Sequence, residues 1–150
     1  MLDLLGHFSL LLLLLGSWEP VLPPGAWAQS PTRVQKFIIQ HISEDPVQCN
    51  NAMRAVNNLT QTCKDQNTFL HDNFENVTVT CGEPNRRCRN GQNNCHQSTY
   101  HINMTHCKLT GGPYPNCQYK TTPRHGPYSV ACNPRQPGFP PNCLFPVHLD

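Results

Sequence analysis

The chain has 150 residues, which is enough for one ordinary domain or two small ones. Charged residues make up 13% and hydrophobic residues 37% of it, whereas nine Cys and fifteen Pro are high counts. This composition excludes a coiled coil, a polytopic membrane protein and a purely disordered chain. It predicts a small core that depends on disulfides, each of which contributes about 2–4 kcal/mol to stability.

The N-terminal segment has the pattern of a secretory signal. An uninterrupted leucine run, Leu10–Leu15, is followed by several prolines and by the small-x-small triplet Ala26–Ala28. The apolar run is shorter than the roughly 20 residues that span a bilayer. We predict that residues 1–28 are a cleaved signal peptide and that residues 29–150 form a single domain; the alternative is a retained hydrophobic anchor.

The mature part has the features of an exported protein. Removal of the signal takes away Asp3 and Glu19 and no basic residue, so the net charge rises from +2 to +4. Three Asn-x-Thr sequons predict N-glycosylation at Asn58, Asn76 and Asn103. No second apolar run follows the signal, so we expect no transmembrane segment.

Helices are expected in the first half of the mature chain. The apolar spacing predicts a helix over Thr32–Ile42 and a second over Cys49–Cys63. Asp72–Cys81 fits a third helix or the start of a strand, and the alternation of Val and Thr in Val77–Thr80 favours the strand.

Strands are expected after Cys81, where short β-like pieces alternate with Gly, Pro and Asn turns. The Pro-rich segment Asn133–Pro141 is predicted to be an extended surface loop. Helices followed by strands indicate an α+β fold. The predicted strands are Ser98–Asn103, Cys117–Thr122 and Tyr128–Cys132.

The cysteine spacing does not determine the disulfide pairing. Eight Cys allow 105 pairings, and one of the nine must also be left out. The sequence contains no Cys-x2-Cys pair, so we expect no metal site.

Four segments together carry a resemblance to a known family. They are Gln40-His41 near the N-terminus, Cys63–Phe69 with the pattern C-K-x-x-N-T-F, the small loop Cys88–Cys95, and Pro146–Asp150 at the end. In this order they are similar to the pancreatic-type ribonuclease (RNase A) superfamily over nearly all of the mature chain. The sequences of residues 94–98 and 146–150 most resemble the leukocyte branch of this superfamily, which includes the eosinophil ribonucleases and ribonuclease six.

The resemblance implies a small disulfide-rich fold, with about three short helices packed on a bent antiparallel sheet. The implied disulfide pairing includes no partner for Cys143, which would be a free thiol, a link to another chain or a source of mispairing. A monomer is expected unless Cys143 links chains. The implied pairs are Cys49–Cys107, Cys63–Cys117, Cys81–Cys132 and Cys88–Cys95.

The resemblance also implies the chemistry. A secreted, cofactor-free endoribonuclease would cleave single-stranded RNA on the 3′ side of pyrimidines through a 2′,3′-cyclic phosphate. His41 would be the general base, His148 the general acid, and Lys64 would offset charge on the phosphoryl oxygens. Two His suit these roles because the ordinary pKa of His, about 6.5, allows one neutral and one charged ring at the same pH.

Further residues are implied to contact RNA. Gln40 would contact the phosphate, and Thr68 would read the pyrimidine edge through its N–H and hydroxyl. Asp150 would orient His148 by accepting its second ring N–H. Gln92 and Asn94 would contact the base on the leaving side of the cleaved bond. Arg89 and Lys36 would be cations for flanking phosphates. Asn67 is a further implied contact.

The remaining histidines are given no catalytic role. His71 matches a structural position of the family, and His96, His101, His106 and His125 are expected at the surface.

Other partners follow from the resemblance alone. The alternative function is a cationic antimicrobial protein of innate immunity that binds anionic microbial surfaces without needing RNA cleavage. A cytosolic ribonuclease inhibitor is a further expected partner, and storage in granules or lysosomes a further expected location.

Overall fold

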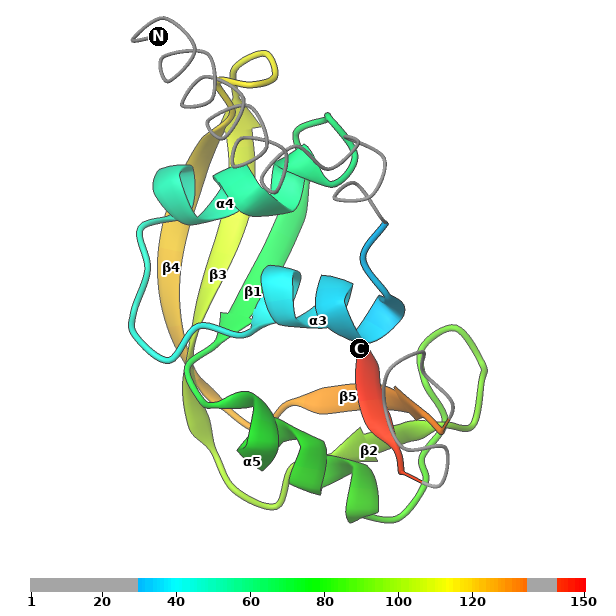
Figure 1. Ribbon diagram of the computed structural model, residues 1–150. Coiled ribbons are helices and arrows are strands. Elements are labelled where there is room, and N and C mark those ends of the chain that lie inside the picture. Colours follow the sequence, from blue (N-terminus) through cyan, green and yellow to red (C-terminus); the bar gives the residue numbers. More distant parts are fainter. Residues whose placement is uncertain (1–29, 135–142) are drawn as a thin grey trace, which may run out of the picture. The chain divides into compact units, whose positions relative to one another are not determined.

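A computed structural model describes residues 30–134 and 143–150 (Figure 1). The predicted signal peptide and most of the predicted loop Asn133–Pro141 lie outside these residues. The described residues from Pro31 onward form one unit, Pro31–Asp150. None of the described helices is both long and apolar enough to cross a membrane.

Helix α3 (Arg33–His41) begins at a capping box. The Thr32 hydroxyl accepts from the Gln35 N–H at 3.1 Å, and the Gln35 side chain accepts from the Thr32 N–H at 2.8 Å. Its buried side chains include Phe37 and, in the last turn, His41. The helix expected over Thr32–Ile42 is therefore confirmed.

Helix α4 (Cys49–Asn58) buries Met53 and Val56, as its apolar stripe predicts. It ends before the expected boundary at Cys63, because the chain turns through Gln61, whose φ of 60° lies outside the helical region.

The third expected helix is present, and the strand alternative was wrong. Helix α5 (Phe74–Val79) starts at Asn73, whose side chain accepts from the Asn76 N–H at 2.8 Å. It continues into the 3₁₀ turn η1 (Thr80–Gly82). The cap and the burial of Val77 outweigh the β preference of alternating Val and Thr.

Two three-stranded antiparallel sheets complete the α+β fold of the described residues (Figure 1). The first has the order β1-β3-β4 and the second β2-β5-β6. Helix α3 contacts β1 of the first sheet and β6 of the second, so it lies against both sheets. The strands are β1 (Gln66–Leu70), β3 (Ile102–Gly111), β4 (Gln118–Gly126), β2 (Cys95–Gln97), β5 (Ser129–Asn133) and β6 (Phe145–Leu149).

The expected strands correspond only in part to the observed ones. Cys117–Thr122 and Tyr128–Cys132 fall on β4 and β5. Ser98–Asn103 was placed too early, because β3 begins at Ile102 and runs to Gly111. Strands β1 and β6, which carry residues of the candidate site, were not predicted at all.

All four implied disulfides are present, and Cys143 is free and exposed. Cys49–Cys107 joins α4 to β3, and Cys81–Cys132 joins η1 to β5. One core cluster lies between α4 and the first sheet, and a second is built on α3, α5 and β5. The second cluster also includes Leu70 of β1 and Ile102 of β3, so it joins the two sheets.

Candidate active site

A cleft of about 590 Å³ lies between the end of α3 and the two sheets. Its walls are formed by residues of α3, of all six strands and of the segments that connect them. The structure brings together here most of the residues named from the sequence. They are Gln40, His41, Lys64, Asn67, Thr68, Arg89, His148 and Asp150.

The His41 ring is buried and fixed in one tautomer. Its side chain is only 8% exposed, and its Nδ1 lies 2.8 Å from the Thr68 carbonyl oxygen. A carbonyl oxygen only accepts hydrogen bonds, so Nδ1 carries the proton and Nε2 keeps its lone pair. This arrangement makes Nε2 the basic atom of the ring.

The electrostatic environment keeps His41 neutral. Burial lowers the pKa of His41 from 6.5 to about 4. The hydrogen bond to the Thr68 carbonyl acts in the opposite direction, while the positive charges of Lys64 and His148 lower the pKa further. A proton acceptor is therefore available at neutral pH.

The Lys64 ammonium group is held by neutral acceptors. Its Nζ donates to Gln40 Oε1 at 2.8 Å and to Asn67 Oδ1 at 2.9 Å, and the Asn67 amide donates to the Gln40 carbonyl at 2.7 Å. Burial lowers the pKa of Lys64. No carboxylate within the described residues pairs with this ammonium group, so its charge is left to act on an anion in the cleft.

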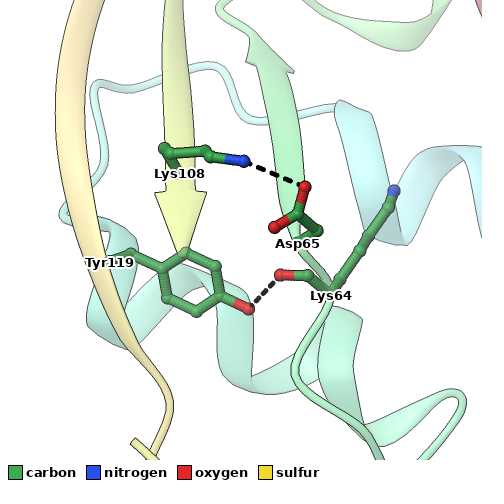
Figure 2. A network of polar contacts seen from close by, with 4 residues as sticks. All are labelled: Lys64, Asp65, Lys108 and Tyr119. Carbon is green, nitrogen blue, oxygen red and sulfur yellow. Dashed lines mark hydrogen bonds and ion pairs between the residues drawn. The ribbon is translucent and has the colours of Figure 1, made fainter. Parts of the chain in front are cut away.

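The backbone of Lys64 is held from both sides. The Tyr119 hydroxyl donates to the Lys64 carbonyl at 2.7 Å (Figure 2). The Lys64 N–H donates to Asn57 Oδ1 at 2.9 Å. Both partners are buried, Tyr119 being 7% and Asn57 3% exposed. The neighbouring Asp65–Lys108 ion pair, at 2.9 Å, is exposed and contributes little. The buried pair is therefore what fixes the start of the lysine side chain.

The pairing of β1 with β3 explains how Thr68 contacts two groups at once. His71 N donates to Asn103 O, and Leu109 N donates to Asp65 O, so the hydrogen-bonded pairs fall on odd-numbered residues of β1. Thr68 and its partner His106 form a non-hydrogen-bonded pair, in which the backbone groups point away from the neighbouring strand.

This geometry turns the Thr68 carbonyl towards His41 and leaves the Thr68 N–H at the sheet edge beside the cleft. Side chains are close in such a pair, and the Thr68 hydroxyl lies 3.1 Å from His106 Nδ1. The expectation that His106 is a surface residue was wrong. It is half-buried and lines the cleft, and burial, Arg124 and Lys108 lower its pKa.

The opposite wall is formed by β6. His148 lines the cleft with an exposed side chain. The Asp150 carboxylate accepts from the Arg89 backbone N–H at 3.1 and 3.3 Å. Among the described residues no hydrogen bond joins Asp150 to His148. The orienting contact expected between them is absent because the carboxylate faces the Cys88–Cys95 loop instead.

Comparison with known proteins agrees with this arrangement. Residues 32–150 match the family model described as pancreatic ribonuclease. The chain belongs to the pancreatic ribonuclease family. It is 54% identical to ribonuclease K3 of Sus scrofa over 143 residues, covering 95% of this chain and 94% of the relative. It is 51% identical to ribonuclease K6 of Homo sapiens, with 95% of each chain covered. The protein is therefore a pancreatic-type ribonuclease, an endonuclease that acts on RNA.

Three named residues of this ribonuclease lie outside the cleft lining. Lys36 is exposed on α3, and Gln92 is exposed in the small disulfide loop. The Asn94 carbonyl accepts from the Cys132 N–H at 3.1 Å, and its amide donates to the Cys132 carbonyl at 3.4 Å, so Asn94 ties that loop to β5.

Two other histidines of the ribonuclease have contacts inside the fold. His71 binds the Ser43 carbonyl through Nδ1 at 2.7 Å and the Thr105 hydroxyl through Nε2 at 2.6 Å. His96 is 2% exposed and its Nδ1 donates to the Glu83 carbonyl at 2.6 Å, so its expected surface position was wrong.

Sequence reasoning also missed several cleft residues. Besides His106, the lining includes Gln66 on β1, Gln97 on β2 and Arg124 on β4. The available signal was the alternation of β3, since a strand through residues 104–108 places Met104 and His106 on one face.

Proposed function

We propose that this ribonuclease cleaves single-stranded RNA on the 3′ side of pyrimidines by transphosphorylation, and that it does so without a metal ion. The observation that carries the proposal is the convergence of His41, Lys64 and His148 on one cleft, with His41 held neutral. These are the groups that an internal attack by a ribose hydroxyl needs: a base, an acid and a fixed cation.

In the first step, His41 Nε2 takes the proton of the ribose 2′-hydroxyl. The 2′-oxygen then forms a bond to the adjacent phosphorus, and the bond from phosphorus to the 5′-oxygen breaks. Protonated His148 gives its proton to that departing oxygen. The products are a 2′,3′-cyclic phosphate and a 5′-hydroxyl end, and water opens the cyclic ester with the two histidines in exchanged roles.

Lys64 stabilises the charge that develops on the phosphoryl oxygens. Its two partners, Gln40 and Asn67, are neutral acceptors that aim the ammonium group without cancelling its charge. Fixed donors of this kind act strongly in a site with little water.

Thr68 selects the base. Its N–H lies at the free edge of β1, and its hydroxyl can donate or accept, which matches N3 of cytosine or N3–H of uracil. Its carbonyl is bound to His41, so the base-reading residue and the proton acceptor are joined directly.

Export and glycosylation are part of the proposal. Four disulfides suit an oxidising compartment. The sequon residues Asn58, Asn76 and Asn103 are all exposed. In the secreted protein, each Asn→Gln change at these positions should lower the mass by that of one glycan. Glycosidase treatment of the unchanged protein should remove the same mass.

The deciding assay uses a fluorogenic strand with a single ribonucleotide, in EDTA, with uridine, cytidine or adenosine at that position. We expect cleavage after the two pyrimidines, a cyclic phosphate detectable by ³¹P NMR, and loss of both in His148→Ala. His125→Ala, an exposed histidine outside the cleft, is the matched control and should keep full activity. Cleavage after adenosine at the same rate, or none in EDTA, would contradict the proposal.

A further inference from the structure

His101 and His125 lie close together on the side of the first sheet that does not form the cleft. In the β3–β4 register Asn103 pairs with His125, and Met104 pairs with Arg124. Because side chains alternate between faces along a strand, Met104 and Arg124, which line the cleft, point to one side, and Asn103 and His125 point to the other. His101 lies two residues before Asn103 and shares its face.

The two rings are close enough to bind one ion. Their centroids are 5.9 Å apart, their planes are inclined at 63°, and both side chains are exposed. With metal–nitrogen bonds of about 2.0–2.1 Å and a further distance of about 1.2 Å to each ring centre, two imidazoles on a tetrahedral ion have centroids about 5.3 Å apart. A small side-chain rotation covers this difference.

The tautomer of His125 is already the one a metal ligand requires. Its Nδ1 lies 2.9 Å from Asn103 Oδ1. An amide oxygen only accepts, so Nδ1 carries the proton and the lone pair lies on Nε2. Histidines that bind metals usually donate their other ring N–H to an oxygen in this manner, which fixes the ring orientation.

We propose that His101 and His125 form a binding site for a late first-row divalent cation, Zn²⁺ or Cu²⁺, with Asn103 orienting His125. Water molecules would complete the coordination sphere. Cu²⁺ should bind more tightly than Zn²⁺, in line with the general affinity order of these ions. The site is separate from the cleft, so the proposal does not depend on the proposed mechanism of RNA cleavage.

The test must separate this pair from the other metal-binding groups of the chain. His41 and His148 line the cleft together, and Cys143 is an exposed thiol. All proteins should therefore carry Cys143→Ser and be made without N-glycans. Titration calorimetry with Zn²⁺ and Cu²⁺ would compare this background with H101Q, H125Q and the double variant, in which the cleft histidines are unchanged.

We expect the double variant to bind one ion fewer per chain than the background protein. Each single change should lower the affinity for that ion by at least about tenfold. N103L should weaken binding through loss of the acceptor, and N103D, which keeps one, should restore it. NMR should show Zn²⁺ shifting the ring signals of His101 and His125 at the lowest concentrations, while RNA cleavage by the metal-free double variant stays at the background rate.

Equal stoichiometry and affinity in the background and the double variant, with Zn²⁺ shifting only the signals of His41 and His148, would overturn the proposal. All substituted side chains are exposed, so circular dichroism should confirm the fold. Should N103L fail to fold, H101Q alone decides, because it leaves the Asn103–His125 hydrogen bond in place.

Discussion

Two of the three histidines that line the cleft, His41 and His148, lie in walls of opposite character. His41 is 8% exposed, and the Thr68 carbonyl fixes its ring. His148 is exposed and makes no side-chain hydrogen bond within the described part of the chain. In the proposed mechanism the base must stay neutral, which burial favours, whereas the acid must carry charge, which water stabilises. The comparison indicates that solvent access separates the two roles.

The largest expected effect comes from removing either histidine. His41→Ala and His148→Ala should each lower kcat/KM by about 10²–10⁴-fold, because each removes a proton-transfer partner of the proposed mechanism. Single-turnover cleavage of a uridine-containing strand measures this. The two variants should also differ in melting temperature, because only the His41 ring is packed inside the fold. Equal melting temperatures for both variants would contradict the comparison.

Lys64→Gln should lower kcat/KM by roughly 10²–10³-fold, because the cation near the phosphoryl oxygens is lost. It should also raise the pKa of His41, since the lysine charge is one of the causes that lower it. NMR titration of the His41 ring reports this second effect. Lys64→Arg, the matched control, keeps the charge and should leave the pKa low.

Acid should destabilise the protein through His41. The folded pKa, about 4, lies below the ordinary value of 6.5, so the unfolded chain binds more protons between these limits. The contribution is complete above pH 6.5 and is lost as the pH falls towards 4, at a cost of about 3 kcal/mol. Urea unfolding at pH 7 and pH 4 measures it, and His41→Gln should reduce the difference. The acidic limb of kcat/KM should likewise lie well below pH 6.5.

Tyr119→Phe removes the hydroxyl that holds the Lys64 carbonyl. Leaving the half-buried carbonyl and the buried Asn57 amide without this partner should cost about 1–3 kcal/mol and displace Lys64. Lys108→Gln, which breaks only the exposed ion pair with Asp65, is the control and should cost at most about 1 kcal/mol. A similar loss of stability and kcat/KM in both variants would exclude a positioning role for the tyrosine.

The smallest expected effect is at His106. Its contact with the Thr68 hydroxyl biases that group as donor or acceptor, so His106→Ala should change the ratio of cytidine to uridine cleavage by a few-fold. Cleavage after either base should otherwise stay within the same order of magnitude. An unchanged ratio would show that the hydroxyl is oriented by the substrate alone.

Local patterns predicted the parts of the fold that local chemistry determines. Apolar spacing predicted α3, whose start the structure shows to be set by a capping box, and the disulfides were implied by the family resemblance. The end of α4 was missed because it depends on the backbone angle of Gln61. Strand β1 was missed because its polar Asn67 is buried against other cleft residues, which a search for alternating apolar residues cannot detect.

The same limit applies to the site. The residues of the three segments were named from the sequence and line one cleft, but their contacts were not predicted. That Asp150 binds the Arg89 backbone instead of His148, and that His106 reaches Thr68, depends on strand pairing between distant parts of the chain. Register of this kind is set by tertiary packing and turns, and a single sequence contains little direct information on it.

The position of Thr68 on an edge strand has one more consequence. β1 ends the first sheet, and an edge strand of this kind can pair with a second chain unless its outward groups are occupied. The outward carbonyl of Leu70 accepts from the Ser43 N–H at 3.1 Å. The imidazole of His41 occupies the Thr68 carbonyl and sets the end of α3 against that edge. The side chain that is proposed to abstract the proton therefore also shields the sheet from pairing with a second molecule, and its removal should favour aggregation.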